Sequence, residues 1–221
     1  MSSTQKNERS PSEGVLRREV VAAGLASLRS VVETGVLGCA VPRAMGGQGG
    51  TLDQLAREAR GVAERSQAAA WVLWAQRMAI EALVHSPNVG VSEHLLPLLL
   101  SGELAGALPL GLDARPLVAE EQGSAFRLYG VLDHVPNLQW IGFSLLCPIR
   151  QHGRPVEWVV LRSEEDGLRV GIDREGVQWY GSRTASVTVD GTFFRMDEWL
   201  GDEDLLAKMT PVMNALRAAR S

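Results

Sequence analysis

The first hundred residues carry apolar side chains at the three- and four-residue intervals of an amphipathic helix. This spacing predicts helices over residues 15–33, 51–63, 67–84 and 92–101. The third is apolar around most of its circumference and contains Trp71 and Trp74, which is typical of the central helix of a bundle. Pro97 in the fourth is expected to kink that helix or to confine it to one or two turns, because proline removes a backbone hydrogen bond.

The first two predicted helices are joined by a segment with six glycines and one proline in sixteen residues, Gly35 to Gly50. Glycine permits positive φ and proline lacks an amide donor, so this segment is predicted to be a loop. Contact with a ligand and a tight crossover between two helices both explain it, and we favour the crossover. Thr51 and Gln54 then have the T-x-x-Q spacing of a capping box at the start of the next helix.

After Gly102 the helical period gives way to short runs of β-forming residues separated by glycine, proline or charged turns. These runs cover residues 126–130, 141–149, 156–161, 168–172 and 186–190. Strands at this spacing predict a small β-sandwich or barrel. A helical pattern returns between Glu203 and Arg220. The sequence contains no alternation of strands and helices, which argues against a Rossmann fold or a TIM barrel.

The predicted fold class is therefore α+β: an all-α domain, a small β-sandwich or barrel, and a short C-terminal helix. The expected boundaries are a disordered tail at 1–13, a helical domain at 14–105, a β domain at 106–201 and a helix at 202–221. The tail is polar and has no apolar core of a signal peptide.

Charge and cysteine usage exclude several classes of partner. The 22 lysines and arginines are scattered against 26 acidic residues, for a net charge of −4, so neither nucleic acid nor an anionic membrane is an expected partner. Cys39 and Cys147 are far apart and form no C-x-x-C pair, which favours neither a disulfide framework nor a zinc site. A cytoplasmic protein is the expectation.

Other candidate chemistries find little support. His85, His94 and His152 lack metal-ligand spacing, and Ser182 and Thr184 have no histidine–aspartate partner nearby. The six tryptophans are equally well explained by core packing and by stacking on a flat ligand. No residue is assigned a catalytic role.

Three passages, taken in order, resemble the acyl-CoA dehydrogenase family. Residues 35–49 have the form G-x-x-G-x-x-x-P…G-G-x-G, and residues 96–103 have the form L-P-x-L-x-x-G-E. Residues 181–201 are similar to the end of the family's β domain. The resemblance implies a helical domain followed by a β domain, an FAD cofactor, an acyl thioester substrate and oxidoreductase activity. The family's catalytic helical bundle would have to follow Ser221, and we expect it to be missing.

The resemblance also implies positions for the flavin site, and the sequence departs from the family there. The family's Thr-Glu pair falls on Gly111 and Leu112, and no Gly-Ser-Asp follows. Its K-x-W-I-T-N motif places a flavin-facing Trp on His134 and a Thr on Pro136, while Asn137 matches. His134 and Asn137 are therefore the candidate cofactor-binding residues, by position in the motif. A lone histidine near a strand end is also commonly just a polar surface residue.

Three hypotheses follow. The first is an acyl-CoA dehydrogenase-like flavoprotein, truncated and weak or dependent on a partner, whose site is completed by a partner chain or a second copy in a homo-oligomer. The second is a non-catalytic module that binds acyl-CoA or an acyl-carrier thioester, or acts as a scaffold. The third is a relative of the flavin-dependent monooxygenases, which rests on fold analogy alone.

Overall fold

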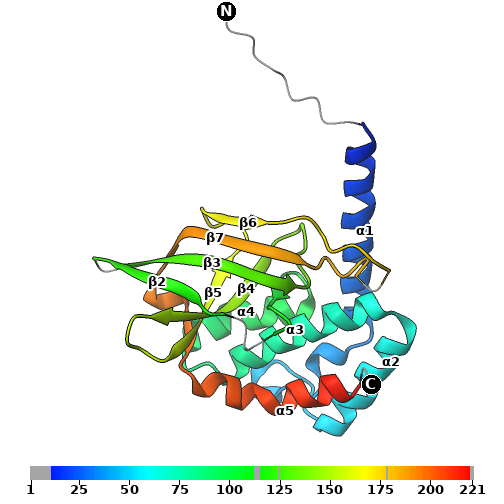
Figure 1. The fold of residues 1–221 in the computed structure, drawn as a ribbon. Helices are drawn as coiled ribbons and strands as arrows, with labels where there is room; N and C mark the ends of the chain where they lie inside the picture. Colours follow the sequence, from blue (N-terminus) through cyan, green and yellow to red (C-terminus); the bar gives the residue numbers. More distant parts are fainter. Residues whose placement is uncertain (1–10, 112–114, 124, 178, 220–221) are drawn as a thin grey trace, which may run out of the picture.

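The computed structural model describes residues 11–111, 115–123, 125–177 and 179–219, and for residues 11–17 and 196 it describes the backbone only. Most of the expected tail, residues 1–10, lies outside this range, and the first helix begins at Pro11. The first half of that helix extends beyond the rest of the molecule (Figure 1). No described helix is long and apolar enough to cross a membrane.

Five α-helices are present in the described residues, and four of them come before the strands. They are α1 (Pro11–Glu33), α2 (Leu52–Arg65), α3 (Gln67–His85), α4 (Val89–Ser101) and α5 (Asp204–Ala218). Three short 3₁₀ turns, η1 (Val36–Gly38), η2 (Arg43–Met45) and η3 (Met196–Glu198), lie in the connections. The helices predicted from the periodicity are confirmed, with ends that move by a few residues.

Helix α3 is the centre of the helical layer. Its residues from Val72 to Leu83 are all buried, while Trp71 is only half-buried. It contacts α1, α2, α4, α5 and β1, so an apolar surface around its whole circumference is covered. The Oγ atom of Ser66 caps it by accepting a hydrogen bond from the Ala69 amide at 3.2 Å. The prediction of a central helix is confirmed.

The expectation that Pro97 would confine the helix to one or two turns is wrong. Helix α4 runs through Pro97 for 13 residues and ends at Gly102, which has a φ of 74°. Pro97 has no N–H to donate to the carbonyl of Glu93, four residues earlier. Both residues are exposed, so solvent can hydrate that carbonyl. The cost of the missing bond is therefore small enough for burial of the helix's apolar face to outweigh it.

The glycine-rich segment is a compact turn that folds back on itself. The Ala40 amide donates to the Gly49 carbonyl at 2.7 Å, and the Gly49 amide donates to the Val41 carbonyl at 2.8 Å. A side chain at Gly47 would lie 2.3 Å from the Val41 carbonyl oxygen, so only glycine fits there. The buried guanidinium of Arg77 donates to the Cys39 carbonyl and ties the turn to α3. These contacts agree with a crossover between helices.

The eight strands found in the described residues form one mixed sheet in the order β6-β7-β3-β2-β4-β5-β8, with β1 paired to β4 beside this path. The strands are β1 (Ala105–Ala107), β2 (Leu117–Gln122), β3 (Ala125–Val135), β4 (Phe143–Gln151), β5 (Val156–Arg162), β6 (Leu168–Val170), β7 (Ala185–Phe194) and β8 (Trp199–Gly201). They lie together on one side of the helices (Figure 1).

The expected β-sandwich or barrel is therefore wrong. Strands β1 and β2 both pair in parallel with β4, which joins the early strands to the later ones in a single sheet. Among the described strands the two ends of the path, β6 and β8, do not pair with each other, so the sheet stays open. The sequence pattern marks most of the strands, but it carries no information on which strands are neighbours.

Close contacts join the helices to the sheet. A Cβ atom at Gly106 in β1 would lie 2.4 Å from the Cβ atom of Ala79 in α3, so the strand and the helix approach as near as backbone allows. The apolar core runs without interruption from the helices into the sheet. Helix α5 returns after the last strand and packs on α2 and α3.

Candidate functional site

The expected cofactor segment lies at the end of β3, where the regular pairing with β7 is interrupted. The register shifts between Leu132 and Val135, and His134 lies within this irregularity. His134 has a φ of 52°, in the left-handed region that non-glycine residues rarely adopt. Its carbonyl accepts a hydrogen bond from the Leu110 amide at 3.1 Å. The irregularity redirects the His134 side chain, which is half-exposed.

His134 is the end of a row of aromatic side chains from three elements. Its ring centroid lies 6.0 Å from that of Trp179, and Trp179 stacks on Trp71 of α3 with 4.9 Å between centroids. The Nδ1 atom of His134 lies 3.4 Å from a guanidinium nitrogen of Arg174. The His134 ring therefore lies beside two of the protein's own tryptophans.

Asn137, the second candidate, is fully buried, and its side chain bonds to other parts of the chain. Its Nδ2 atom donates to Gln76 Oε1 at 2.7 Å and to the Gly106 carbonyl at 3.0 Å. Its Oδ1 atom accepts from Gln139 Nε2 at 3.0 Å. Both N–H groups of the Asn137 side-chain amide and one of the two lone pairs on its oxygen thus already have hydrogen-bond partners within the protein.

Gln76, Asn137 and Gln139 together form what we call the amide network. Gln76 Nε2 donates to the carbonyls of Leu99 and Leu104, and Gln76 Oε1 also accepts from the Gly106 amide. At the other end, Gln139 Nε2 donates to the Gly24 carbonyl in α1. The network links α1, α3, α4 and β1 to the segment after β3. Its role is therefore structural.

The residues at the expected flavin positions do not fit a flavin ring. Pro136 is buried and has no backbone N–H to offer. Asn137 is occupied by the amide network. Gly111 is exposed and has no side chain, and Leu112 lies outside the described residues. Only His134 keeps an accessible polar group, and its Nδ1 already faces Arg174.

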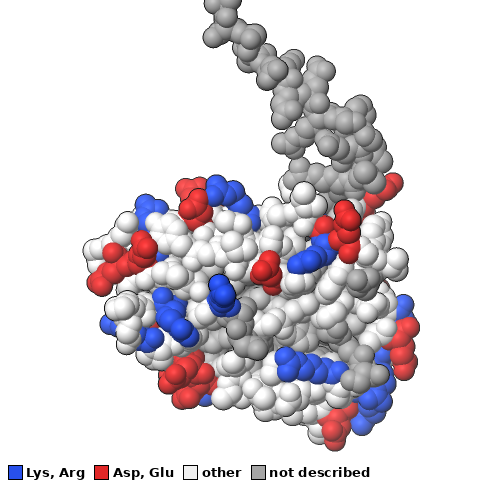
Figure 2. All heavy atoms as spheres, in the orientation of Figure 1, with Lys and Arg blue, Asp and Glu red and all other residues white. Residues whose placement is uncertain are grey.

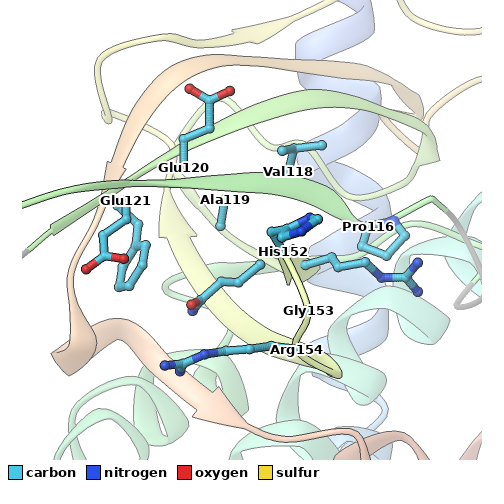
Figure 3. A pocket seen from close by; sticks show the side chains of 11 residues that line it. Pro116, Val118, Ala119, Glu120, Glu121, His152, Gly153 and Arg154 are labelled. Carbon is cyan, nitrogen blue, oxygen red and sulfur yellow. The ribbon is translucent and has the colours of Figure 1, made fainter.

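A second site, which was not among the candidates from the sequence, is an open cavity of about 710 Å³ beside β2. Strand β2 pairs with β4 over only three residues, Leu117 to Ala119, before β4 turns into β5 and leaves β2. The space between β2 and the turn is the cavity, which we call the β2–hairpin cavity (Figure 3). Its lining residues include Ala119, Glu121, Phe126, Arg150, His152 and Arg154.

Cationic and apolar groups face the β2–hairpin cavity together. Arg150, His152 and Arg154 come from the hairpin, whereas Glu120 and Glu121 come from β2. Glu120 points to the other side of β2 from His152 and Arg154, whereas Glu121 points to their side and places a carboxylate opposite the hairpin (Figure 3). The hairpin side of the cavity is consequently the positive side. A sequence signal exists, because residues 150–154 place three basic side chains at every second position around a glycine turn.

The face drawn in Figure 2 carries both signs of charge. On the face drawn in Figure 2, acidic and basic side chains are interspersed among uncharged ones. Among the described residues, no group of three His, Cys, Asp or Glu side chains is placed to hold a metal ion.

The remaining buried ionisable groups serve packing. Arg77 and Glu81 form a buried ion pair in α3 with 2.9 Å between nitrogen and oxygen, and His85 extends it toward solvent. Burial lowers the pKa of Arg77, and the carboxylate of Glu81 opposes that shift. Burial raises the pKa of both thiols, Cys39 and Cys147, so neither is activated as a nucleophile.

Comparisons with known proteins support the fold and not a closer relationship. No family model and no curated protein sequence matches the chain. Among solved structures, an FAD-dependent dehydrogenase aligns with a TM-score of 0.72 and 15% identity, over 96% of this chain and 63% of that one. Butyryl-CoA dehydrogenase from Megasphaera elsdenii aligns with a TM-score of 0.70 and 15% identity, over 86% and 54%.

A prolyl acyl carrier protein oxidase also aligns, with a TM-score of 0.69 and 17% identity over 96% of this chain and 65% of that one. The chain thus spans less than two thirds of the length of these structures. The resemblance to acyl-CoA dehydrogenases expected from the sequence is confirmed at the level of the fold.

Proposed function

Starting from the acyl-CoA dehydrogenase fold, we propose that this protein binds an acyl thioester carried on phosphopantetheine, in the β2–hairpin cavity. The observation that carries the proposal is the lining of that cavity. Arg150 and Arg154 supply positive charge on the hairpin side, while Ala119 and Phe126 supply apolar surface. A phosphopantetheine thioester has a phosphate at one end, an extended arm, and an apolar acyl group at the other.

The size and chemistry of the cavity suit such a ligand. A volume of about 710 Å³ lies within the usual range of small-molecule sites. Guanidinium groups bind phosphate through charge-assisted hydrogen bonds. The named activities of two structural neighbours, a butyryl-CoA dehydrogenase and a prolyl acyl carrier protein oxidase, involve CoA and carrier-protein thioesters respectively.

The test is titration of the purified chain with CoA and butyryl-CoA by calorimetry. The variant Arg150→Ala/Arg154→Ala should bind CoA roughly tenfold more weakly, because two exposed charge-assisted contacts contribute about 0.5–1 kcal/mol each after solvent screening. Arg60→Ala on the exposed surface of α2 is the matched control and should leave the affinity unchanged. Affinity should also fall as salt is raised.

Two outcomes would overturn the proposal: no binding of either ligand, or binding that the double variant leaves intact. An acylated carrier protein used in place of CoA separates the two sources of phosphopantetheine. If it binds and CoA does not, the protein domain of the carrier supplies part of the contact.

A flavin-dependent dehydrogenase, completed by a partner chain or a second copy, is the second candidate. It is favoured by the fold shared with an FAD-dependent dehydrogenase. The expected flavin-facing residues do not fit the cofactor, so we rank it below thioester binding. The visible spectrum of the purified protein and a titration with FAD decide between them, since bound flavin is yellow and free chain is colourless.

A further inference from the structure

A second cavity has a volume of about 580 Å³, and part of its wall is the segment that follows Asn137. It lies among α1, residues 138–143, the turn after β5, and β6 with the residues that follow it. We call it the α1–β6 cavity. Its apolar lining is formed by Val20, Leu138, Trp140, Phe143, Val170 and Ile172. It shares no lining residue with the β2–hairpin cavity.

The floor of the α1–β6 cavity is rigid. Arg183 has a φ of 53°, a conformation that non-glycine residues hold only when their surroundings impose it. Its carbonyl accepts from the Leu138 amide at 3.1 Å, and its Nε atom donates to the Leu138 carbonyl at 3.2 Å. Gly24 of α1 packs so closely on Arg183 that a Cβ there would lie 2.3 Å from the arginine Cγ. A pocket with such a floor is preformed.

The charge at this cavity is negative. The guanidinium of Arg183 is paired with the carboxylate of Asp173, so these two charges cancel. Glu164 remains as an exposed carboxylate on the rim, where it accepts a hydrogen bond from Ser163. A cation entering the cavity is therefore attracted and an anion is repelled.

Gln139 forms a fixed part of the cavity wall. Gln139 lines the cavity, and its Nε2 atom donates to two acceptors, the Gly24 carbonyl and Asn137 Oδ1. This fixes the orientation of the amide, because a flipped amide would bring oxygen against oxygen. Its Oε1 atom is buried and has no partner among the described residues. This oxygen has almost no accessible surface, so Gln139 contributes to the wall of the cavity and not a contact for the ligand's donor.

We propose that the α1–β6 cavity is a binding site for a small organic amine, with an apolar ring or chain against the apolar walls and an ammonium group toward Glu164. This ligand class differs in charge from a phosphopantetheine thioester. The proposal goes beyond thioester binding, and each stands or fails without the other.

The probe is 2-phenylethylammonium, with phenylacetate as an anion of similar shape. Saturation-transfer NMR and calorimetry on the full chain should give a dissociation constant of about 1 mM or below for the ammonium ion, the range expected for a fragment of this size. Phenylacetate should bind at least about tenfold more weakly, because the cavity carries net negative charge.

Two lysine substitutions form a matched pair. Ile172 and Val177 are 92% and 94% exposed, so a lysine at either position should leave the fold intact. Only Ile172 lines the cavity. Ile172→Lys should weaken binding of the ammonium probe at least about tenfold, through charge repulsion at the mouth, while Val177→Lys should leave it within twofold of wild type.

Equal binding of the two probes, or equal effects of Ile172→Lys and Val177→Lys, would overturn the proposal. So would the absence of binding to wild type at millimolar probe concentration. Glu164→Gln gives a further check, with a several-fold loss for the ammonium ion and no loss for phenylacetate. CoA affinity measured in the same variants should stay unchanged, which separates a failure here from a failure of the proposed thioester site.

Discussion

Removing the Asn137 side chain should destabilise the protein without weakening thioester binding. Asn137 is the central member of the amide network and makes three side-chain hydrogen bonds, all buried. In Asn137→Ala these bonds are lost together. Its φ of 67° adds a second penalty, because alanine is strained in the left-handed region where asparagine is tolerated.

The expected magnitude follows from these contacts. Three buried hydrogen bonds contribute about 1 kcal/mol each, and the strain of alanine at positive φ adds about 1 kcal/mol more. The free energy of unfolding should therefore fall by about 4 kcal/mol, a large share of the roughly 5–15 kcal/mol typical of native proteins. Asn137→Gly loses the same bonds without the strain, so it should be about 1 kcal/mol less destabilised than Asn137→Ala.

Urea unfolding followed by tryptophan fluorescence measures both variants. Affinity for CoA, determined well below the transition, should stay within twofold of wild type, since Asn137 does not line the β2–hairpin cavity. A loss of stability under about 1 kcal/mol in Asn137→Ala would refute the assignment of a structural role. A stable variant that has lost ligand or flavin binding would restore Asn137 as a site residue.

Three further predictions concern the core, the pH dependence and the activity. Trp74→Ala should lower the free energy of unfolding by about 3–5 kcal/mol, because Trp74 is only 2% exposed in the central helix. A melting temperature within a degree or two of wild type would contradict this. Burial raises the pKa of Glu198, so the folded state holds its proton more tightly than the unfolded state and stability falls as pH rises through that window. Glu198→Gln keeps an acceptor for the Arg195 amide and should therefore gain stability over wild type at pH 7 but not at pH 4, as urea unfolding at the two pH values will reveal. Finally, the chain with added FAD should oxidise short, medium and long acyl-CoAs little or not at all, because Pro136 and Asn137 have no free hydrogen-bonding group for the flavin. An assay with an artificial electron acceptor tests this. Turnover of a few per second that His134→Ala abolishes would contradict it.

The helical part of the fold could be predicted because its signals are local. Half of the capping box predicted at Thr51 is present. The Thr51 Oγ1 atom accepts a hydrogen bond from the Gln54 backbone amide as predicted, but the Gln54 side chain donates to Glu58 and does not complete the box. Pro97 shows the limit of local signals more clearly. Its local cost is real, and burial of the rest of α4 outweighs it.

The sheet could not be predicted to the same depth because its pairings are not local. Strand β2 was missed, since Val118 and the three polar residues that end it mark an exposed strand and not an apolar run. Its parallel partner, β4, comes about 25 residues later, and neither segment carries a sequence signal that would identify the other as its partner. Because β2 and the β4–β5 hairpin line the larger cavity, the site was missed together with the pairing.

The candidate residues themselves could be located but not interpreted. A position in a motif placed His134 and Asn137 three residues apart near the end of a strand, and the structure has them there. What each side chain touches depends on partners far away in the chain, such as Gln76 and Arg174. Position in a sequence motif therefore says where a residue lies, whereas its role depends on those partners.

The packing of α5 on α2 and α3 affects how the chain folds as it leaves the ribosome. Helix α5 begins about 120 residues after α3 ends, so at translation rates of roughly 5–20 residues per second the two helices emerge many seconds apart. Throughout that interval one side of α3 has no covering helix. The nascent protein thus passes through a stage in which its central helix is a target for holding chaperones, and slow synthesis before α5 would prolong that exposure.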